Sequence, residues 1–512
     1  MAAARTSQTL TEAPDYRKLA GESRRQPCYM WKCLETLVRR RQLLLLGPAA
    51  LAVGATVARA ADGVVAAAHP LATAAGIAVL RRGGTAFDAA IAVSLALGVV
   101  EPQSSGIGGG GFATIWEGRT GRARFLDFRE VAPTRATPTM YLDSAGKVIP
   151  RLSLDGYLAV GVPAQAAGLA KLHATYGTLP LAELAAPAIR YAREGFAVTP
   201  MLHRRLTGAI ERLRRDPETF RIFYPEGRVL GVGEILRQPD LARTLELWAK
   251  TGGESFYRGE TAEKIAAAMA ARGGLVSAAD LAGYRTLWRE PLTARYRGVA
   301  LVTTPPPAGG PVLVEMLNIL ENFDLARASA TERAHLLAQA MQRAYADRSR
   351  FLGDPDFVPV PAAALVDPAY GRALAATIDR TRATPSATVT PGERLPENIR
   401  ERFTAWEAPR VAENTSHFSV IDGEGNAVSL TQTINGAFGA AVVPPSTGIL
   451  LNNQMDDFAT APGVPNLYGL VGSKANAIAP GKRPLSSTTP TILLKDGRPW
   501  VALGGAGGSF IT

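Results

Sequence analysis

Cysteine and histidine are scarce in this chain of 512 residues, which contains two cysteines and five histidines. Both cysteines, Cys28 and Cys33, precede a predicted leader cleavage site, so we expect the mature protein to have no thiol, disulfide bond or cysteine metal ligand. The histidines lack the spacing of metal ligands, and the sequence contains no HExxH motif. The sequence therefore predicts no metal site and no bound cofactor.

The N-terminal region has no hydrophobic run long enough to anchor the chain in a membrane. Leu43 to Val57 covers fifteen residues, whereas a membrane-spanning helix needs about 20. This run follows Arg39-Arg40-Arg41 and precedes Ala58-Arg59-Ala60, the pattern of a secretory signal with its cleavage site. We expect residues 1–60 to be a targeting segment of a periplasmic or secreted protein without a stable membrane anchor. Met30 could be the true start, or the arginines could form a twin-arginine signal.

Aromatic residues are also few, at 7% of the chain, and no lysine and arginine run is interleaved with them. Despite a net charge of +11, this pattern argues against nucleic-acid binding, so we expect no nucleic-acid partner. A composition of 47% hydrophobic and 20% charged residues is typical of a globular protein, long enough for one large core or two ordinary domains.

Helical and strand patterns alternate along the chain. A helix is predicted over Ala72–Arg81, and a capping box at Thr85 opens a second, very apolar helix through Val100. Two strands, Phe112–Trp116 and Arg124–Phe128, flank a glycine-rich turn. From residue 164 to about residue 350 the pattern is mainly helical, with apolar stripes over Ala164–Tyr176, Leu181–Glu194, Thr261–Ala271 and Thr331–Phe351. Arg382–Glu413 has the composition of a linker, after which strand patterns follow.

The glycine cluster Gly106–Gly111 formally contains a GxGxxG motif. A dinucleotide-binding loop requires a strand before the glycines and a helix after them. Here a helix pattern precedes the cluster and a strand pattern follows it, so we interpret it as a packed turn.

A hairpin is predicted around Glu424. His417–Ile421 and Ala427–Asn435 alternate in polarity on either side of a turn-rich segment. With Glu424 at the centre of the turn, Thr415 faces Thr433, and opposed residues have Cβ atoms about 4.5–5.5 Å apart. The two hydroxyls are therefore expected to meet. Because threonine is simply a good strand residue, the hairpin alone favours a structural role for both.

From about Asp62 to Thr512 the chain resembles the γ-glutamyltranspeptidases (glutathione hydrolases), which are N-terminal-nucleophile hydrolases. The resemblance depends on the joint order of several motifs along the chain. It implies an α+β fold, a four-layer αββα sandwich with two sheets between helical layers. The motifs are His69-Pro70-Leu71-Ala72-Thr73, Gly106 to Phe112, Asp127-Phe128-Arg129-Glu130, Met341 to Pro355, Thr415 to Ser419, Asn452 to Phe458, Lys482 to Ser487, and Gly504 to Ser509.

The family's nucleophile corresponds to Thr415 and its activating partner to Thr433. The resemblance implies that the precursor cleaves itself between Asn414 and Thr415, into a large-subunit portion of residues 61–414 and a small-subunit portion of residues 415–512. A threonine hydroxyl is a poor nucleophile until a base takes its proton. The freed α-amine of Thr415, with an ordinary pKa of about 7.7–8.0, can serve as that base.

The resemblance also assigns groups to the substrate carboxylate and to the oxyanion. Arg129 corresponds to the residue that pairs with the α-carboxylate of the γ-glutamyl group, a role that suits the planar fork of a guanidinium. Ser486 and Ser487 correspond to the hydroxyls that hold the same carboxylate. The backbone N–H groups of Gly507 and Gly508 correspond to the oxyanion hole.

Other positions correspond to the groups around the α-ammonium, namely Asn435, Gln454 and Asp457, of which Asp457 supplies the countercharge. Residues 465–480, which include Tyr468, resemble the lid over the donor site in some family members. The implied substrates are γ-glutamyl amides such as glutathione, with water, an amino acid or a dipeptide as acceptor and a γ-glutamyl-threonine intermediate.

His417 lies two residues beyond Thr415 on the same strand, which suggests a serine-histidine type of arrangement. We interpret it instead as a structural polar residue, since the α-amine already provides a base.

Three alternatives remain open from the sequence. The chain could be a related cephalosporin acylase or a poly-γ-glutamate depolymerase, although Arg129, Asp457 and the two serines favour an amino-acid head group over a glutaryl group. It could also be an unprocessed, inactive protein. Family members continue for roughly ninety residues beyond the position of Thr512, so we expect this chain to be truncated at the C-terminus and its self-cleavage to be conditional.

Overall fold

The computed structural model describes residues 63–397, 415–461, 463–508 and 512. The predicted targeting segment, its cleavage site, both cysteines, Asn414 and the second half of the predicted linker lie outside the described residues. Within the described part of the chain, no helix combines the length and the apolar character needed to cross a membrane.

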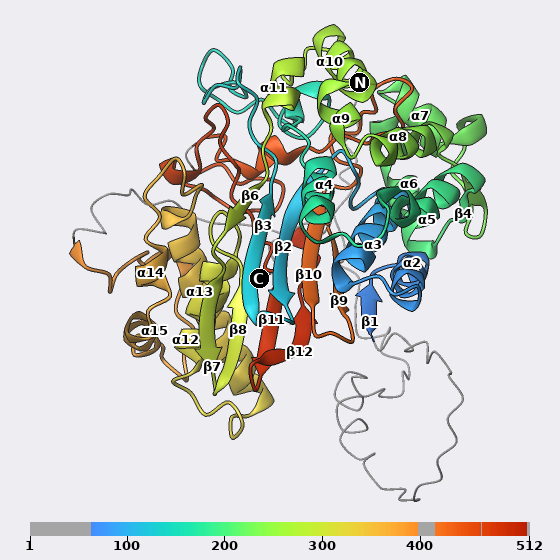
Figure 1. Ribbon diagram of the computed structural model, residues 1–512. Coiled ribbons are helices and arrows are strands. Elements are labelled where there is room, and N and C mark those ends of the chain that lie inside the picture. Colours follow the sequence, from blue (N-terminus) through green and yellow to red (C-terminus); the bar gives the residue numbers. More distant parts are fainter. Residues whose placement is uncertain (1–62, 398–414, 462, 509–511) are drawn as a thin grey trace, which may run out of the picture. The chain divides into compact units, whose positions relative to one another are not determined.

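A six-stranded sheet carries the predicted hairpin (Figure 1). All of its neighbouring strands run antiparallel. The hairpin register is the predicted one, because His417 lies opposite Thr431 and Ser416 lies opposite Gln432. In spatial order the strands are β1 (Val64–Ala67), β9 (Ser416–Ile421), β10 (Ala427–Thr433), β2 (Gly110–Glu117), β3 (Arg122–Phe128) and β6 (Leu287–Arg289).

A second, four-stranded antiparallel sheet has the order β12 (Arg498–Leu503), β11 (Thr491–Lys495), β8 (Val299–Thr303) and β7 (Leu292–Tyr296).

Strands β6, β7 and β8 interrupt the region that the sequence analysis described as mainly helical, so that description was incomplete. The β7–β8 hairpin turns at Arg297 and Gly298, both with positive φ. Such a turn normally carries Asn-Gly or Asp-Gly, so Arg-Gly gave a weak signal. A further two-stranded sheet joins β4 (Phe196–Ala197) and β5 (Ile235–Leu236).

The predicted helices are confirmed to within two residues at each end. They are α2 (Pro70–Arg81), α3 (Ala86–Val100), α4 (Gln165–Tyr176), α5 (Leu181–Glu194), α10 (Glu260–Ala271) and α13 (Ala330–Phe351). The capping box of α3 is present, with Thr85 and Asp88 binding each other's backbone N–H groups. The other helices are α6 (Pro200–Leu213), α7 (Pro217–Phe223), α8 (Pro239–Lys250), α9 (Glu254–Arg258), α11 (Ala278–Gly283), α12 (Gly310–Leu320), α14 (Ala362–Leu365) and α15 (Pro368–Ala375).

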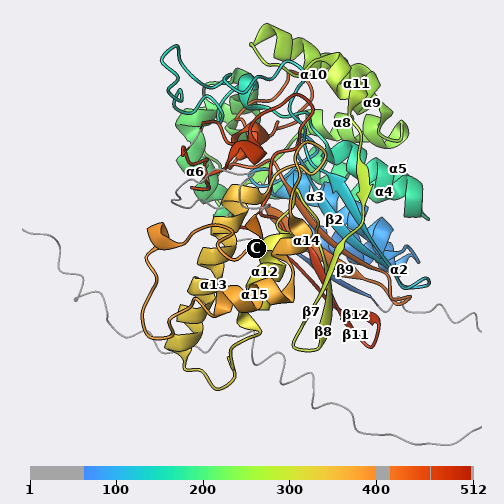
Figure 2. The same ribbon diagram turned by 90° about the vertical axis from the view of Figure 1, so that its left-hand side faces the viewer.

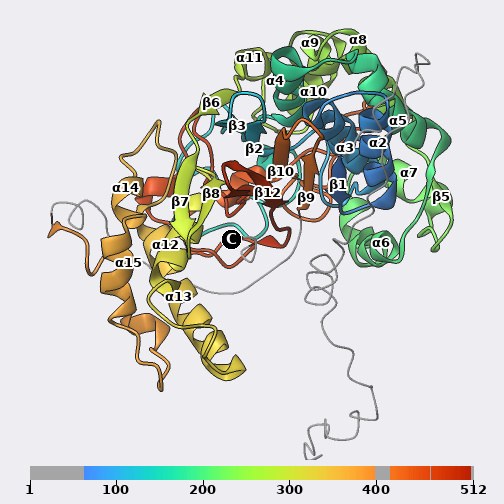
Figure 3. The ribbon, with the colours of Figure 1, turned by 60° about the horizontal axis from the view of Figure 1, so that its bottom comes forward.

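Helices α12, α13 and α15 lie together, apart from the group that contains α2, α3, α4 and α5 (Figures 2 and 3). Helix α3 is buried along almost its whole length and packs against β9 and β10, while α12 contacts β7 on the side of the other sheet. Trp116 and Ala427 of the larger sheet pack against Val302 and Ile492 of the smaller one. The protein therefore has a mixed α/β fold built on antiparallel sheets, and β9 and β10 are covered on both faces.

The glycine cluster follows α3 and continues into the first two residues of β2, in the predicted order of helix, turn and strand. A Cβ atom on Gly109 would lie 2.1 Å from the carbonyl oxygen of Thr433, and one on Gly111 would lie 2.4 Å from that of Thr431. These contacts are too short for any side chain, so the glycines allow the backbone to approach the end of β10. The cluster is thus a packed turn that supports the strand carrying Thr433.

Candidate active site

Thr415 and Thr433 meet at the open end of the hairpin. Thr415 immediately precedes β9, is 9% exposed, and its Oγ1 donates a hydrogen bond of 3.3 Å to Oγ1 of Thr433. Thr433 Oγ1 also accepts a hydrogen bond of 2.8 Å from the backbone N–H of Asn435. Asn435 has a φ of +72°, a conformation that asparagine tolerates better than most residues. The chain therefore turns after β10 in a way that fixes the Thr433 hydroxyl toward Thr415.

Arg129 and Asp457 form a partly buried ion pair beside the two threonines. Arg129 follows β3, is 1% exposed, and its Nη2 lies 2.5 Å from Oδ2 of Asp457. Its Nε donates to the carbonyl oxygen of Pro484 at 3.2 Å. Gln454 donates from Nε2 to the same Asp457 oxygen at 2.8 Å. Arg129 was expected to bind the carboxylate of an amino-acid head group and Asp457 its ammonium. In the structure these two side chains form an ion pair with each other.

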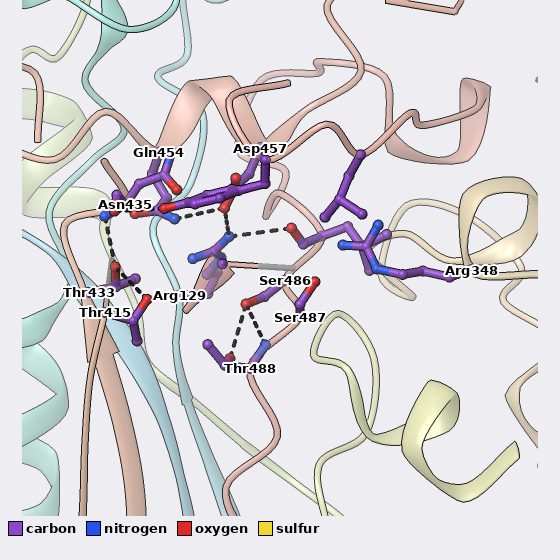
Figure 4. A pocket seen from close by; sticks show the side chains of 14 residues that line it. Arg129, Arg348, Thr415, Thr433, Asn435, Gln454, Asp457, Ser486, Ser487 and Thr488 are labelled. Atoms are coloured by element: carbon purple, nitrogen blue, oxygen red, sulfur yellow. Dashed lines mark hydrogen bonds and ion pairs between the residues drawn. The ribbon is translucent and has the colours of Figure 1, made fainter. Parts of the chain in front are cut away.

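One pocket brings together most of the residues that the sequence analysis singled out (Figure 4). Gly507 is not among the residues that line it, whereas Gly508 is, and both have positive φ. Tyr468 lies in the pocket wall and donates from Oη to the carbonyl oxygen of Asn435 at 2.8 Å. Asn414 lies outside the described residues. The predicted site residues that line the pocket are Arg129, Thr415, Thr433, Asn435, Gln454, Asp457, Tyr468, Ser486, Ser487 and Gly508.

The two serines differ in their hydrogen bonds. Ser486 Oγ lies 3.0 Å from Oγ1 of Thr488. Ser487 Oγ is buried without a hydrogen-bond partner among the described residues. A buried polar atom without a partner costs free energy, so the Ser487 hydroxyl is suited to receive a partner from a bound molecule.

Two charged residues at the site were missed by the sequence analysis. Arg348 of α13 lines the pocket. Glu130, next to Arg129, is fully buried and neither of its carboxyl oxygens has a hydrogen-bond partner within the described parts. Both residues lie in motifs that carried the family resemblance, but only their burial reveals them. Burial raises the pKa of Glu130 to about 8, although the Arg129 guanidinium opposes the shift.

Replacing Glu130 by glutamine is expected to change how stability depends on pH. Because the pKa of Glu130 is higher in the folded chain, the folded state keeps a proton that the unfolded chain releases above pH 4.5, and wild-type stability falls as the pH rises from about 5 to about 8. Glu130→Gln removes this contribution. The free energy of unfolding of the variant relative to wild type should increase over that range by on the order of 3 kcal/mol. Urea unfolding at several pH values measures it; parallel curves for the two proteins would contradict the expectation.

His417 has the contacts of a structural residue. Its Nδ1 lies 2.9 Å from Oγ1 of Thr431 and its Nε2 lies 3.0 Å from Oγ of Ser419. Burial lowers the pKa of His417 to about 4. Both ring nitrogens are therefore used within the hairpin, and neither is bonded to Thr415.

Replacing His417 by glutamine is expected to lower the catalytic rate by less than about tenfold, because a general base contributes roughly 10²–10⁴-fold and this residue is not placed to be one. The rate should be measured from pH 5 to 9. The acid limb of the profile should keep its midpoint in the variant, and loss of that limb would assign the base to His417.

Comparisons with known proteins find γ-glutamyltranspeptidases and also an acylase. The family model described as Gamma-glutamyltranspeptidase matches residues 72–512. The glutathione hydrolase proenzyme of Escherichia coli (strain K12) is 44% identical over 457 residues, which cover 88% of this chain and 76% of that protein. The crystal structure of Helicobacter pylori γ-glutamyltranspeptidase is similar with a TM-score of 0.63 and 41% identity, over 64% of this chain and 96% of that chain. The crystal structure of a cephalosporin acylase from Bacillus halodurans is similar with a TM-score of 0.73 and 32% identity, over 90% and 80% of the two chains.

Proposed function

This chain belongs to the γ-glutamyltranspeptidase family of enzymes, and we propose that it cleaves itself before Thr415 and then hydrolyses or transfers γ-glutamyl groups. The substrates are glutathione and other γ-glutamyl amides, and the acceptors are water, amino acids or dipeptides. The observation that carries the proposal is the contact between Thr415 and Thr433 in the same pocket as the Arg129–Asp457 pair. A nucleophile and the two charges needed to recognise an amino acid are thereby combined.

Self-cleavage divides the chain into residues 61–414 and 415–512 and gives Thr415 a free α-amine. That amine takes the proton from Oγ1 as the oxygen attacks the γ-carbonyl carbon of the donor. The Thr433 hydroxyl, held by the backbone N–H of Asn435, keeps Oγ1 in place. The tetrahedral intermediate collapses with loss of the amine leaving group, which takes up the proton. The product is a γ-glutamyl ester of Thr415.

The second half of the reaction repeats the first with another nucleophile. Water or the amino group of an acceptor gives a proton to the α-amine of Thr415 and attacks the ester carbonyl. The ester bond breaks, Oγ1 of Thr415 recovers its proton, and glutamate or a γ-glutamyl peptide leaves. In both halves the backbone N–H groups of Gly507 and Gly508 are the proposed donors to the oxyanion; the place of Gly508 in the pocket lining supports its part in this role.

The donor's head group replaces the internal ion pair. Its carboxylate binds Arg129 and the hydroxyls of Ser486 and Ser487, and its ammonium binds Asp457, with Asn435 and Gln454 completing that side. The buried position of Arg129 supports this role, because charge-assisted hydrogen bonds are strongest away from water. Tyr468 forms part of a lid over the donor.

We also propose that the elements form a four-layer αββα sandwich. The packing of α3 on β9 and β10, of α12 on β7, and of the two sheets on each other supports this arrangement. Residues 1–60 are proposed to direct the protein to the periplasm or out of the cell; the signal-like sequence supports this location.

An acylase is the second candidate, favoured by the similarity to a cephalosporin acylase. The ammonium of a γ-glutamyl head group matches Asp457, whereas a glutaryl group has no ammonium and offers that carboxylate no new partner. The charges of the pocket therefore support a γ-glutamyl donor.

The test compares 4-nitroaniline release from γ-glutamyl and glutaryl 4-nitroanilides, with a denaturing gel of the same preparation. We expect two bands and a preference for the γ-glutamyl compound of about 100-fold or more. Faster release from the glutaryl compound would establish the acylase instead. A single band without release from either compound would establish the unprocessed, inactive protein.

A further inference from the structure

Arg348 is the charged residue of the pocket that the proposed chemistry does not use. It belongs to α13, is 4% exposed, and lines the pocket together with Arg129, Asp457 and Ser487. Figure 4 shows Thr415 and Thr433 on one side of the pocket and Arg348 on the other, beyond Arg129 and the two serines. Its guanidinium thus approaches the end of the pocket that is remote from the nucleophile.

Arg348 has few partners among the described residues. No carboxylate there forms an ion pair with it, its Nε is buried without a hydrogen-bond partner, and Asp457, already paired with Arg129, is the carboxylate whose charge reaches it. Two other buried arginines face a carboxylate: Arg129 pairs with Asp457, and Arg483, whose Nε also lacks a hydrogen-bond partner among the described residues, lies 3.4 Å from Asp127. An unpaired buried cation is costly, and a ligand that brings an anion repays the cost.

We propose that Arg348 binds the α-carboxylate of the γ-glutamyl donor as a second guanidinium, opposite Arg129. This inference depends on the proposed function and adds a specificity-determining residue to it. When the donor's ammonium takes over Asp457, the carboxylate that it carries faces Arg129 and Arg348 together. The unpartnered hydroxyl of Ser487 lies in the same part of the pocket.

The position of Arg348 indicates which carboxylate it binds, that of the donor head group or that of the leaving peptide. The γ-carbonyl carbon must reach Thr415, and the α-carbon, two methylene groups away, lies toward Arg129. Arg348 lies beyond Arg129 as seen from Thr415 (Figure 4), on the same side as the head group. A carboxylate at the α-carbon is therefore the anion that Arg348 meets.

The experiment removes each half of this interaction in turn. Wild type, Arg348→Gln and Arg348→Lys are compared on γ-glutamyl 4-nitroanilide and on 4-aminobutanoyl 4-nitroanilide, which lacks the α-carboxylate. Arg333→Gln removes an exposed arginine from the same helix and is the matched control. Loss of one charge-assisted contact should lower kcat/KM of Arg348→Gln for the γ-glutamyl donor about 30-fold, mostly through KM. The rate on 4-aminobutanoyl 4-nitroanilide should change by less than about threefold, and Arg348→Lys should recover part of the loss.

A binding measurement accompanies the kinetics and needs no turnover. Millimolar L-glutamate should raise the melting temperature of wild type and of Arg333→Gln, but not of Arg348→Gln, while 4-aminobutanoate should act equally on all three. Equal losses on both anilides, or equal stabilisation of Arg348→Gln by glutamate, would overturn the inference and assign Arg348 a structural role. If wild type releases no 4-nitroaniline, the proposed function fails, and the glutamate measurement still decides what Arg348 binds.

Discussion

Thr415→Ala is expected to remain a single polypeptide and to lose at least about 1,000-fold of the rate on γ-glutamyl 4-nitroanilide, as removal of a nucleophile generally does. The reason is twofold. Without Oγ1 there is no atom to attack the peptide bond before residue 415, so neither the subunits nor the free α-amine form. Without the same oxygen no γ-glutamyl ester can form. A denaturing gel and the release of 4-nitroaniline measure the two consequences on one sample.

Thr415→Ser is the matched control for this prediction. It keeps the hydroxyl and loses only a methyl group, so it should still cleave itself, more slowly than wild type, and retain measurable turnover. The melting temperature of processed Thr415→Ser should stay close to that of processed wild type, because among the described residues the Thr415 side chain makes one hydrogen bond, to Thr433, which serine can keep. Two bands from Thr415→Ala, or an unchanged rate, would show that Thr415 is not the nucleophile.

Much of the hairpin was predictable because its signals are local. Alternating polarity on both sides of a turn sets the register, and a one-residue shift would move Leu430 from the apolar core that it shares with Phe418 to the face that carries Thr431 and Thr433. The capping box at Thr85 and the apolar stripes of the long helices are similarly local, so the sequence predicted these helix ends closely.

What the sequence did not reveal depends on contacts between distant segments. Strand β8 pairs with β11, almost two hundred residues away, and β7 pairs with β8; the short alternating patterns of both lie among helical ones. The burial of Glu130 and the missing partner of Arg348 are likewise properties of the packed chain. From the sequence pattern of α13, Arg348 is expected to be an ordinary polar residue of the helix. Only the tertiary structure places it in the pocket.

Replacing Arg129 by methionine is expected to have the second largest effect. The guanidinium is buried and paired with Asp457, so its removal leaves that carboxylate without its cation and should lower the free energy of unfolding by about 3 kcal/mol. Loss of a bidentate contact with the donor carboxylate should lower kcat/KM about 1,000-fold. Arg122→Gln, also on β3, is the control: its pair with Glu290 is exposed, with N and O 3.9 Å apart, and should contribute less than about 0.5 kcal/mol.

A second substitution separates the two effects of Arg129→Met. Adding Asp457→Asn removes the charge that the first change left unpaired, so part of the lost stability should return in the double variant. The activity should not return, because the double variant lacks both groups that recognise the head group. Urea unfolding and the rate on γ-glutamyl 4-nitroanilide are measured on wild type, Arg129→Met, Asp457→Asn and the double variant, and give both quantities. If stability and activity recovered together, Arg129 would act through folding alone, and recognition of the donor carboxylate would have to lie elsewhere in the pocket.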